Sequence, residues 1–143
     1  MKREFAKSTE SLEGIFDFLT EYVRDEGIAE EYLPSLHLAV EEVFVNLVRH
    51  NTESCHDVAI ELSFDNAELT ITLRDKDVQH YDITKHAAVD INQPVEQRRP
   101  GGLGVHFVRQ IMDEIQYDYT DRTSTIRLVK RLEAEDVEDT TSQ

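Results

Sequence analysis

The amino-acid sequence predicts an α+β fold, a two-layer α/β sandwich in which helices pack on one face of a mixed, mostly antiparallel sheet. Apolar residues recur at helical spacing over residues 8–27, 34–51 and 103–115. They alternate with polar residues over residues 58–73 and 124–132, as expected of half-buried strands. Helices and strands therefore occur in groups rather than in strict alternation, which favours an antiparallel sheet with one covered face.

Composition narrows the class of protein. The 143 residues suffice for one domain with a single core, and 30 acidic against 15 basic side chains give a formal charge of −15. Such a charge repels nucleic acid and anionic membranes. The single cysteine permits no intrachain disulfide, and no apolar run approaches the ~20 residues that a bilayer crossing needs. We expect a soluble cytoplasmic protein with no nucleic-acid or membrane partner.

The N-terminal third predicts a short edge strand followed by two helices. Residues 3–7 are mixed in character and read as the strand. Ser8 is a suitable N-cap for the first helix and Gly27 a suitable end. The second helix is expected over residues 34–51, where Pro34 suits the first turn because its missing N–H leaves no bond unmade.

The remaining elements are two hairpins separated by a loop and a helix. The turn "DNAE" at residues 65–68 joins the first pair of strands, and residues 116–121 pair with 124–132 as the second. Residues 76–102 lose all periodicity, and so long an irregular segment is more typical of a functional loop than of a connector. Residues 133–143 are acidic and nearly free of apolar side chains, which predicts a disordered tail after a domain of residues 1–132.

Three polar residues recur every four positions in "AVEEVFVNLVRHN": Glu42, Asn46 and His50. Such residues lie one above another on a helix, and the simplest interpretation is the solvated edge of a buried helix. Asparagine is a poor choice for that purpose, because its side chain competes for backbone hydrogen bonds. An amide oxygen can instead bind Mg²⁺, and a carboxylate one turn earlier can deprotonate a nucleophile nearby.

An aspartate stands at the exit of an apolar strand in "LRDKD". Asp75 there can simply begin a turn, which is the commoner case. A partly buried carboxylate could instead accept a hydrogen bond from a ligand donor, such as the amino group of adenine.

A glycine cluster leads directly into a helix in "RRPGGLGVHFVRQIMDEI". Glycines let backbone N–H groups approach a phosphate closely, and a helix N-terminus adds unpaired donors and a favourable dipole. Glycine before a helix is also ordinary turn chemistry. Arg98 and Arg99 favour the phosphate interpretation, since they form a basic pair in a strongly acidic chain.

These segments, in this chain order, resemble the ATP-binding domain of the gyrase and histidine-kinase (GHKL) type. The resemblance is greatest to the short bacterial serine/threonine kinases that act as anti-sigma factors, and it covers residues 5–132. "EEVFVNLVRH" resembles the first box of that family, "LRDKD" the second, and "RRPGGLGVHFVRQIMDEIQY" the glycine box. The implied architecture is the two-layer Bergerat sandwich with a mobile lid between the second and third boxes.

The resemblance assigns roles to individual residues. It implies that Glu42 is the catalytic base, that Asn46 binds Mg²⁺ and that Asp75 reads adenine. His50 falls where the first box usually has a basic residue or a histidine, and Thr125 resembles a threonine on the adenine side. The residues expected to bind ATP are Asn46, His50, Asp75, Asp77, Arg99, Gly101, Gly102, Leu103, Gly104 and Thr125.

The activity implied by the resemblance is transfer of the ATP γ-phosphate to a serine or threonine. The acceptor would be a small anti-sigma-factor antagonist, with a sigma factor as the competing partner and a homodimer as the frequent assembly. Such a protein regulates transcription by partner switching in bacterial signalling.

One position departs from the family pattern. Asp77 stands where the second box usually has glycine. Either Asp75 still reads adenine with a rearranged loop, or Asp77 takes that role, or nucleotide binding is weakened. We favour the first, because Asp75 directly ends the strand.

Two other functions remain open. The chain could be a catalytically weak or inactive switch whose partner affinity changes when ATP orders the lid. It could also be a protein-interaction domain without ATP that binds a basic partner, although that role does not require Glu42, Asn46 and the glycines together. A two-component histidine kinase is disfavoured, because there is no room for a separate hairpin with a phosphorylated histidine.

Overall fold

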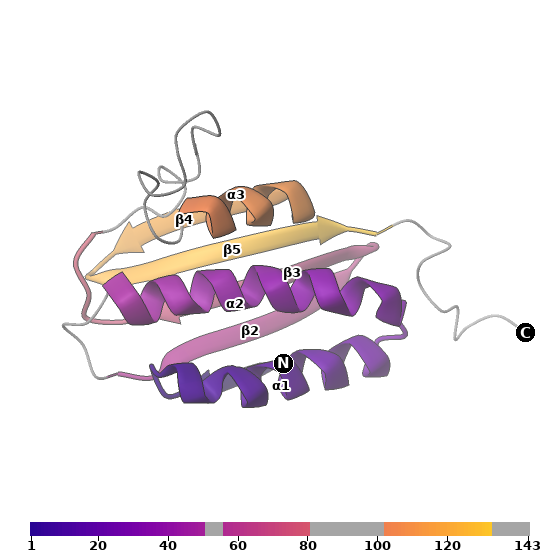
Figure 1. The fold of residues 1–143 in the computed structure, drawn as a ribbon, viewed down its shortest axis with the longest axis horizontal. Coiled ribbons are helices and arrows are strands. Elements are labelled where there is room, and N and C mark those ends of the chain that lie inside the picture. Colours follow the sequence, from indigo (N-terminus) through magenta and orange to yellow (C-terminus); the bar gives the residue numbers. More distant parts are fainter. Residues whose placement is uncertain (51–55, 81–101, 133–143) are drawn as a thin grey trace, which may run out of the picture.

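The structure is a computed structural model that describes residues 1–50, 56–80 and 102–132. Within these ranges, three α-helices and five strands form two layers (Figure 1). The elements are β1 (Lys2–Phe5), α1 (Leu12–Asp25), α2 (Leu33–His50), β2 (Val58–Asp65), β3 (Glu68–Asp75), α3 (Gly102–Ile111), β4 (Glu114–Thr120) and β5 (Thr123–Arg131), with 3₁₀ turns at Thr9–Ser11 and Glu30–Tyr32.

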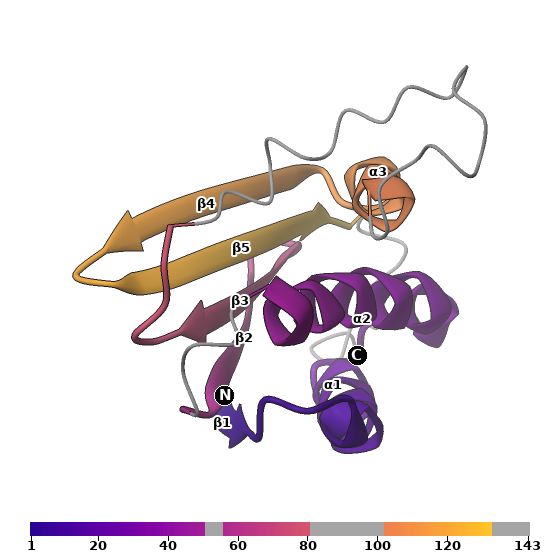
Figure 2. The ribbon, with the colours of Figure 1, turned by 60° about the vertical axis from the view of Figure 1, so that its left-hand side comes forward.

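The five strands form one sheet in the order β1-β2-β3-β5-β4. Every pairing among the described strands is antiparallel, so this part of the sheet is uniform rather than mixed. Figure 2 shows all three helices on the same side of the sheet. The predicted α+β sandwich is therefore confirmed.

Both hairpins turn through two residues with positive φ. Asn66 and Ala67 have φ of 51° and 60°, and Asp121 and Arg122 have φ of 52° and 60°. Two consecutive left-handed residues match the twist of antiparallel strands, which is why such turns dominate tight hairpins. The turn predicted at residues 65–68 is confirmed.

The first two helices begin and end close to the predicted positions. Ser8 caps the 3₁₀ turn before α1 rather than α1 itself, and its Oγ accepts the Glu10 N–H over 3.2 Å. Gly27 has φ of 70°, the left-handed conformation that stops a helix. Pro34 lies in the first turn of α2 as expected.

The prediction of a helix to residue 115 was wrong, because α3 ends at Ile111. Lys130 Nζ donates to the Ile111 carbonyl over 2.9 Å and so satisfies one of the carbonyls left open at the helix end. The Asp113 N–H then donates to the Val129 carbonyl over 2.8 Å. These contacts bring the chain alongside β5, where β4 begins at Glu114.

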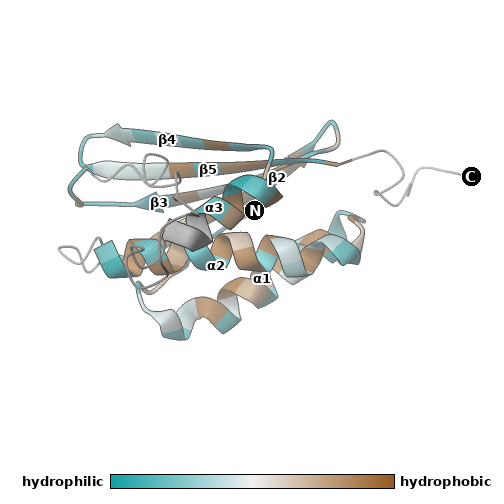
Figure 3. Cartoon of the chain, turned by 45° about the horizontal axis from the view of Figure 1, so that its top comes forward, coloured by the Kyte–Doolittle hydropathy of each residue, from teal (hydrophilic) through white to brown (hydrophobic). Residues whose placement is uncertain are grey.

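The core fills the space between the helices and the sheet. Phe18 and Phe44 from the helices and Ile60, Leu73 and Leu128 from the strands are among its fully buried members. Figure 3 shows hydrophobic residues along α1 and α2 and in the middle of the strands. Each such side chain contributes roughly 1.5–3 kcal/mol through burial. This packing positions α2 over the sheet.

Candidate functional site

The three candidate segments converge on one end of the sandwich. Figure 1 shows the end of α2, the end of β3, the start of β5 and the start of α3 at its left side. Helices α2 and α3 also pack against each other. Segments far apart in the sequence therefore come together, as the resemblance implies.

The three polar residues that recur along α2 differ in how far they are exposed to solvent. Asn46 is 5% exposed, Glu42 is half-buried, and His50, the last residue of α2, is exposed. Asn46 is thus not part of a solvated edge. Its Nδ2 donates to the Glu42 carbonyl over 2.8 Å. This bond fixes the orientation of the side-chain amide, so that the amide oxygen, Oδ1, points away from the Glu42 carbonyl.

The carboxyl group of Glu42 has an altered pKa. Partial burial raises this pKa, the nearby Glu41 carboxylate raises it further, and the Arg49 guanidinium opposes both. A carboxylate of this kind holds a proton more strongly than an ordinary glutamate does. It is therefore better suited to accept a proton from an attacking hydroxyl.

Asp75 is completely buried at the end of β3. Lys7, in the segment between β1 and α1, places Nζ 2.7 Å from Asp75 Oδ1, and its side chain is only 6% exposed. The contact is a charge pair rather than a well-aligned hydrogen bond. Sequence reasoning missed Lys7, because nothing in its local surroundings indicates a distant partner.

The register of β3 and β5 separates two neighbouring candidates. Asp75 pairs with Ser124, whereas Thr125 pairs with Arg74. Ser124 is 2% exposed and shares the helix-facing side of the sheet with Asp75, and Thr125 lies on the opposite face. Ser124 rather than Thr125 is therefore beside Asp75. The alternation with the buried Ile126 was the signal that could have found it.

Asp77 keeps the backbone conformation that glycine would provide. Its φ is 56°, in the left-handed region that aspartate tolerates better than most residues. Its Oδ2 lies 2.8 Å from His56 Nε2, and both side chains are exposed. Asp75 is thus the buried carboxylate of the second box, and Asp77 is a surface residue paired with histidine.

The segment after the second box is fixed to the β4–β5 hairpin. The Val78 N–H donates to the Arg122 carbonyl over 3.0 Å, and the Tyr119 hydroxyl donates to the Val78 carbonyl over 2.7 Å. The His80 ring meets Tyr117 and Tyr119 edge-on, with centroids 5.4 and 5.2 Å away. The expected lid therefore begins from an anchored position, and most of it lies outside the described residues.

The glycine box places a helix N-terminus at this end of the molecule. Gly102 is the first residue of α3, and Gly104 lies in its first turn. The first turn of a helix has backbone N–H groups without intrahelical partners and a positive dipole end, both of which suit a phosphate. Arg98, Arg99 and Gly101 lie outside the described residues, as does the side chain of Leu103.

The side chains at this end of the molecule suit a magnesium ion that is bound mainly by the phosphates of the nucleotide. Within the described ranges, no group of three or more His, Cys, Asp or Glu side chains could hold a metal. Mg²⁺ commonly takes one or two protein oxygens and completes its shell with phosphate and water. Asn46 Oδ1 is a hard oxygen ligand of this kind, so Asn46 fits the role that the sequence predicts.

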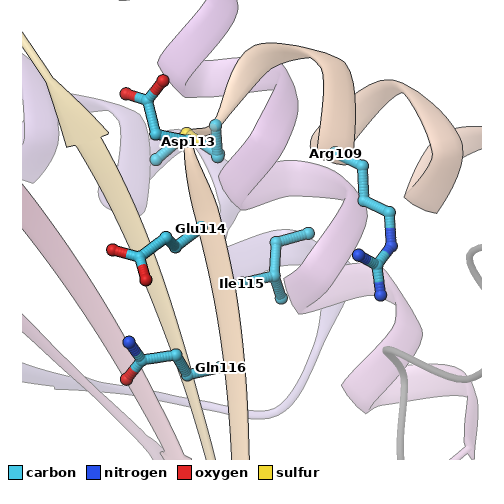
Figure 4. A pocket seen from close by; sticks show the side chains of 6 residues that line it. Arg109, Asp113, Glu114, Ile115 and Gln116 are labelled. Carbon is cyan, nitrogen blue, oxygen red and sulfur yellow. The ribbon is translucent and has the colours of Figure 1, made fainter.

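A separate pocket of about 250 Å³ lies at the other end of α3, around the start of β4 (Figure 4). Its lining residues are Arg109, Met112, Asp113, Glu114, Ile115 and Gln116. Figure 4 shows Arg109 and Glu114 on opposite sides of Ile115. None of the residues expected to bind ATP contributes to it.

The chain belongs to the Histidine kinase-like ATPase domain family, whose sequence model matches residues 5–130. The fold and the three converging segments agree with that membership. Among the described helices, none combines the length and apolar character needed to cross a bilayer.

The curated relatives include serine-protein kinases. The serine-protein kinase RsbW of Bacillus mycoides (strain KBAB4) is 29% identical over 116 residues, which cover 78% of this chain and 72% of the relative. RsbW of Bacillus cereus (strain AH187) is 29% identical over 117 residues, with the same coverage of 78% and 72%.

Solved structures share the fold. The RsbU and RsbW domains of Rv1364c from Mycobacterium tuberculosis match with a TM-score of 0.66 and 11% identity over 92% of this chain and 32% of that longer chain. A chain of the SiaB–SiaC complex from Pseudomonas aeruginosa matches with a TM-score of 0.63 and 14% identity, covering 90% of this chain and 88% of the other. At these identities the likeness concerns the fold alone.

Proposed function

We propose that the protein is an ATP-dependent serine/threonine kinase of the anti-sigma-factor type, which phosphorylates a small antagonist protein and regulates transcription by partner switching. The observation that carries this proposal is the hydrogen bond from Asn46 to the Glu42 carbonyl, which holds a metal ligand one turn from a half-buried base. The serine-protein kinase names of the relatives and the complex formed by SiaB support it.

ATP would bind across the end of the sandwich. Asp75 accepts a hydrogen bond from the adenine amino group, with Ser124 beside it. The first turn of α3 donates backbone N–H groups to the phosphates. Asn46 holds Mg²⁺, which neutralises charge on the phosphates when bound.

Glu42 would act in the transfer itself. Its carboxylate accepts the proton of a serine or threonine hydroxyl while that oxygen attacks the γ-phosphorus. The bond from phosphorus to the β,γ-bridging oxygen breaks, and ADP leaves with that electron pair. The raised pKa of Glu42 makes its carboxylate a stronger base than that of an ordinary glutamate.

The proposal extends to partners and organisation. The phosphorylated partner is an antagonist protein, a sigma factor competes for the same kinase, and the kinase works as a homodimer in the cytoplasm. We assign residues 1–132 to the ATPase domain, whereas most of the expected lid and the expected tail at residues 133–143 lie outside the described residues.

The alternative is a nucleotide-gated interaction switch with weak or no catalysis. One observation favours it: the carboxylate expected to read adenine is already paired with Lys7. If the ammonium is not displaced or shared, ATP binds weakly and transfer is slow.

A transfer assay separates the two functions. The full chain is incubated with γ-labelled ATP, Mg²⁺ and each small antagonist-like protein encoded in the same genome, beside the Glu42→Gln and Glu31→Gln variants. Glu31 is exposed on the turn before α2 and controls for the charge change. We expect label on a serine or threonine with wild type and Glu31→Gln, and a loss of at least about a hundredfold with Glu42→Gln. Tight Mg²⁺-ATP binding without transfer to any partner would select the switch.

A further inference from the structure

Lys7 is held in a fixed position at the tip of a tight turn. The Ser8 N–H donates to the Ala6 carbonyl over 2.8 Å, closing a turn around Lys7. The Ser11 hydroxyl donates to the same carbonyl over 2.7 Å and ties the turn to the start of α1. The ammonium group that reaches Asp75 therefore extends from an ordered segment rather than from a loose terminus.

The Lys7–Asp75 pair is more deeply buried than any other ion pair among the described residues. The two side chains are 6% and 0% exposed, whereas both partners in each of the other pairs are at least a third exposed. Removing two charges from water costs free energy that their attraction often fails to recover, and an apolar pair of similar size is often equally stable or more so. Stability is therefore a weak reason for a charged pair here.

The pair presents an acceptor and a donor side by side. A carboxylate only accepts hydrogen bonds and an ammonium only donates them, and here the two groups lie 2.7 Å apart. Adenine carries the complementary pattern on one edge, with an amino donor at C6 and an acceptor at the adjoining N1. Guanine reverses that pattern, with an acceptor at O6 and a donor at N1.

We propose that Lys7 and Asp75 together read the edge of the purine, so that Lys7 is a specificity-determining residue of the nucleotide site. Asp75 accepts from the C6 amino group while Lys7 donates to N1. This inference rests on the proposed function, because it takes Asp75 as the adenine-reading residue.

The same geometry rejects guanine at two positions. A guanine in the adenine orientation places O6 against the carboxylate and the N1 proton against the ammonium. Each mismatch leaves a buried polar group without a partner, which is the most effective way for a site to discriminate. Selectivity for adenine would therefore depend on Lys7 as well as on Asp75.

Nucleotide analogues test the proposal on the unmodified chain. Dissociation constants are measured by calorimetry with Mg²⁺ for ATP, 1-deaza-ATP, 7-deaza-ATP and purine riboside triphosphate, which lacks the amino group. We expect 1-deaza-ATP to bind about ten- to a hundredfold more weakly than ATP, because it loses a hydrogen bond to a charged donor. The matched control, 7-deaza-ATP, should bind nearly as ATP does. Equal binding of ATP and 1-deaza-ATP would overturn the role of Lys7.

The amino-deficient analogue keeps the two proposals distinguishable. Weak binding of purine riboside triphosphate together with normal binding of 1-deaza-ATP would leave Asp75 as the adenine reader and remove only Lys7. Normal binding of purine riboside triphosphate would remove Asp75 itself from base recognition. The proposed function would then lose its adenine site independently of Lys7.

A Lys7→Met variant provides the complementary test. We expect ATP to bind about ten- to a hundredfold more weakly, 1-deaza-ATP to bind as ATP does, and the preference for ATP over GTP to fall. Lys2→Met is the control, because Lys2 is exposed on β1 and the charge change is identical. Tighter ATP binding by Lys7→Met would mean that the ammonium blocks the site, which contradicts the proposal. Should that variant fail to fold, the analogue series on the unmodified chain decides alone.

Discussion

Ser124 lies directly across the β3–β5 pair from Asp75, on the side of the sheet that the helices cover. The neighbouring Thr125 faces the other way. Of these two adjacent hydroxyl groups, only that of Ser124 therefore lies on the same face of the sheet as the buried Asp75 carboxylate.

The first prediction compares these two hydroxyl groups. Ser124→Ala should weaken ATP binding about two- to tenfold, because the hydroxyl beside Asp75 could no longer hydrogen-bond to a nucleotide bound there. Thr125→Val, which removes a hydroxyl on the opposite face, should change the dissociation constant little. Calorimetric titration of both variants checks this. A larger effect at Thr125 than at Ser124 would show that the nucleotide approaches the other face.

The second prediction concerns the pH dependence of phosphate transfer. Glu42 must be deprotonated to act as a base, and its raised pKa places the acidic limb of the kcat profile above the range of an ordinary glutamate. Glu41→Gln removes a like charge that raises this pKa, so the limb should move to lower pH. Glu31→Gln should leave the limb in place. An unmoved limb in Glu41→Gln would contradict the assignment of that limb to Glu42.

The third prediction concerns stability. The pKa of Glu42 is higher in the folded protein than its usual value, so the folded state binds the proton more tightly than the unfolded state. Stability is therefore lost as the pH rises from the ordinary carboxyl value through the raised one. Glu42→Gln should melt at a higher temperature than wild type at neutral pH, and the difference should shrink below pH ~4. A lower melting temperature at neutral pH would mean that the ionised group stabilises the fold.

The fourth prediction concerns the backbone at Asp77. Its φ of 56° suits glycine and is strained for alanine. Asp77→Ala should lower the free energy of unfolding by about 1 kcal/mol, whereas Asp77→Gly should change it little. The exposed contact with His56 is lost in both variants and contributes little. Urea denaturation measures the difference, and equal losses in the two variants would argue against backbone strain.

The sequence predicted the features that depend on local patterns. The helical spacing around Asn46 and the alternation leading to Asp75 placed both residues on the correct elements, because packing follows those periods closely. The turn at Asn66 and the stop at Gly27 followed from local backbone chemistry.

The features that sequence reasoning missed depend on register and on distant contacts. Ser124 and Thr125 differ by one position, and one position in a strand reverses the face. The end of α3 is set by Lys130, which arrives from another element. Lys7 pairs with a residue far along the chain, and no local pattern encodes such a contact.

The most direct test of the proposed nucleotide site is calorimetric titration with a non-hydrolysable ATP analogue, with and without Mg²⁺, of wild type and Asn46→Ala. Gln116→Ala removes an exposed amide on β4 and serves as the control. We expect Mg²⁺-dependent binding by wild type and Gln116→Ala, and loss of the Mg²⁺ dependence in Asn46→Ala. Binding by Asn46→Ala that responds to Mg²⁺ as wild type does, or no binding by wild type at millimolar nucleotide, would contradict it.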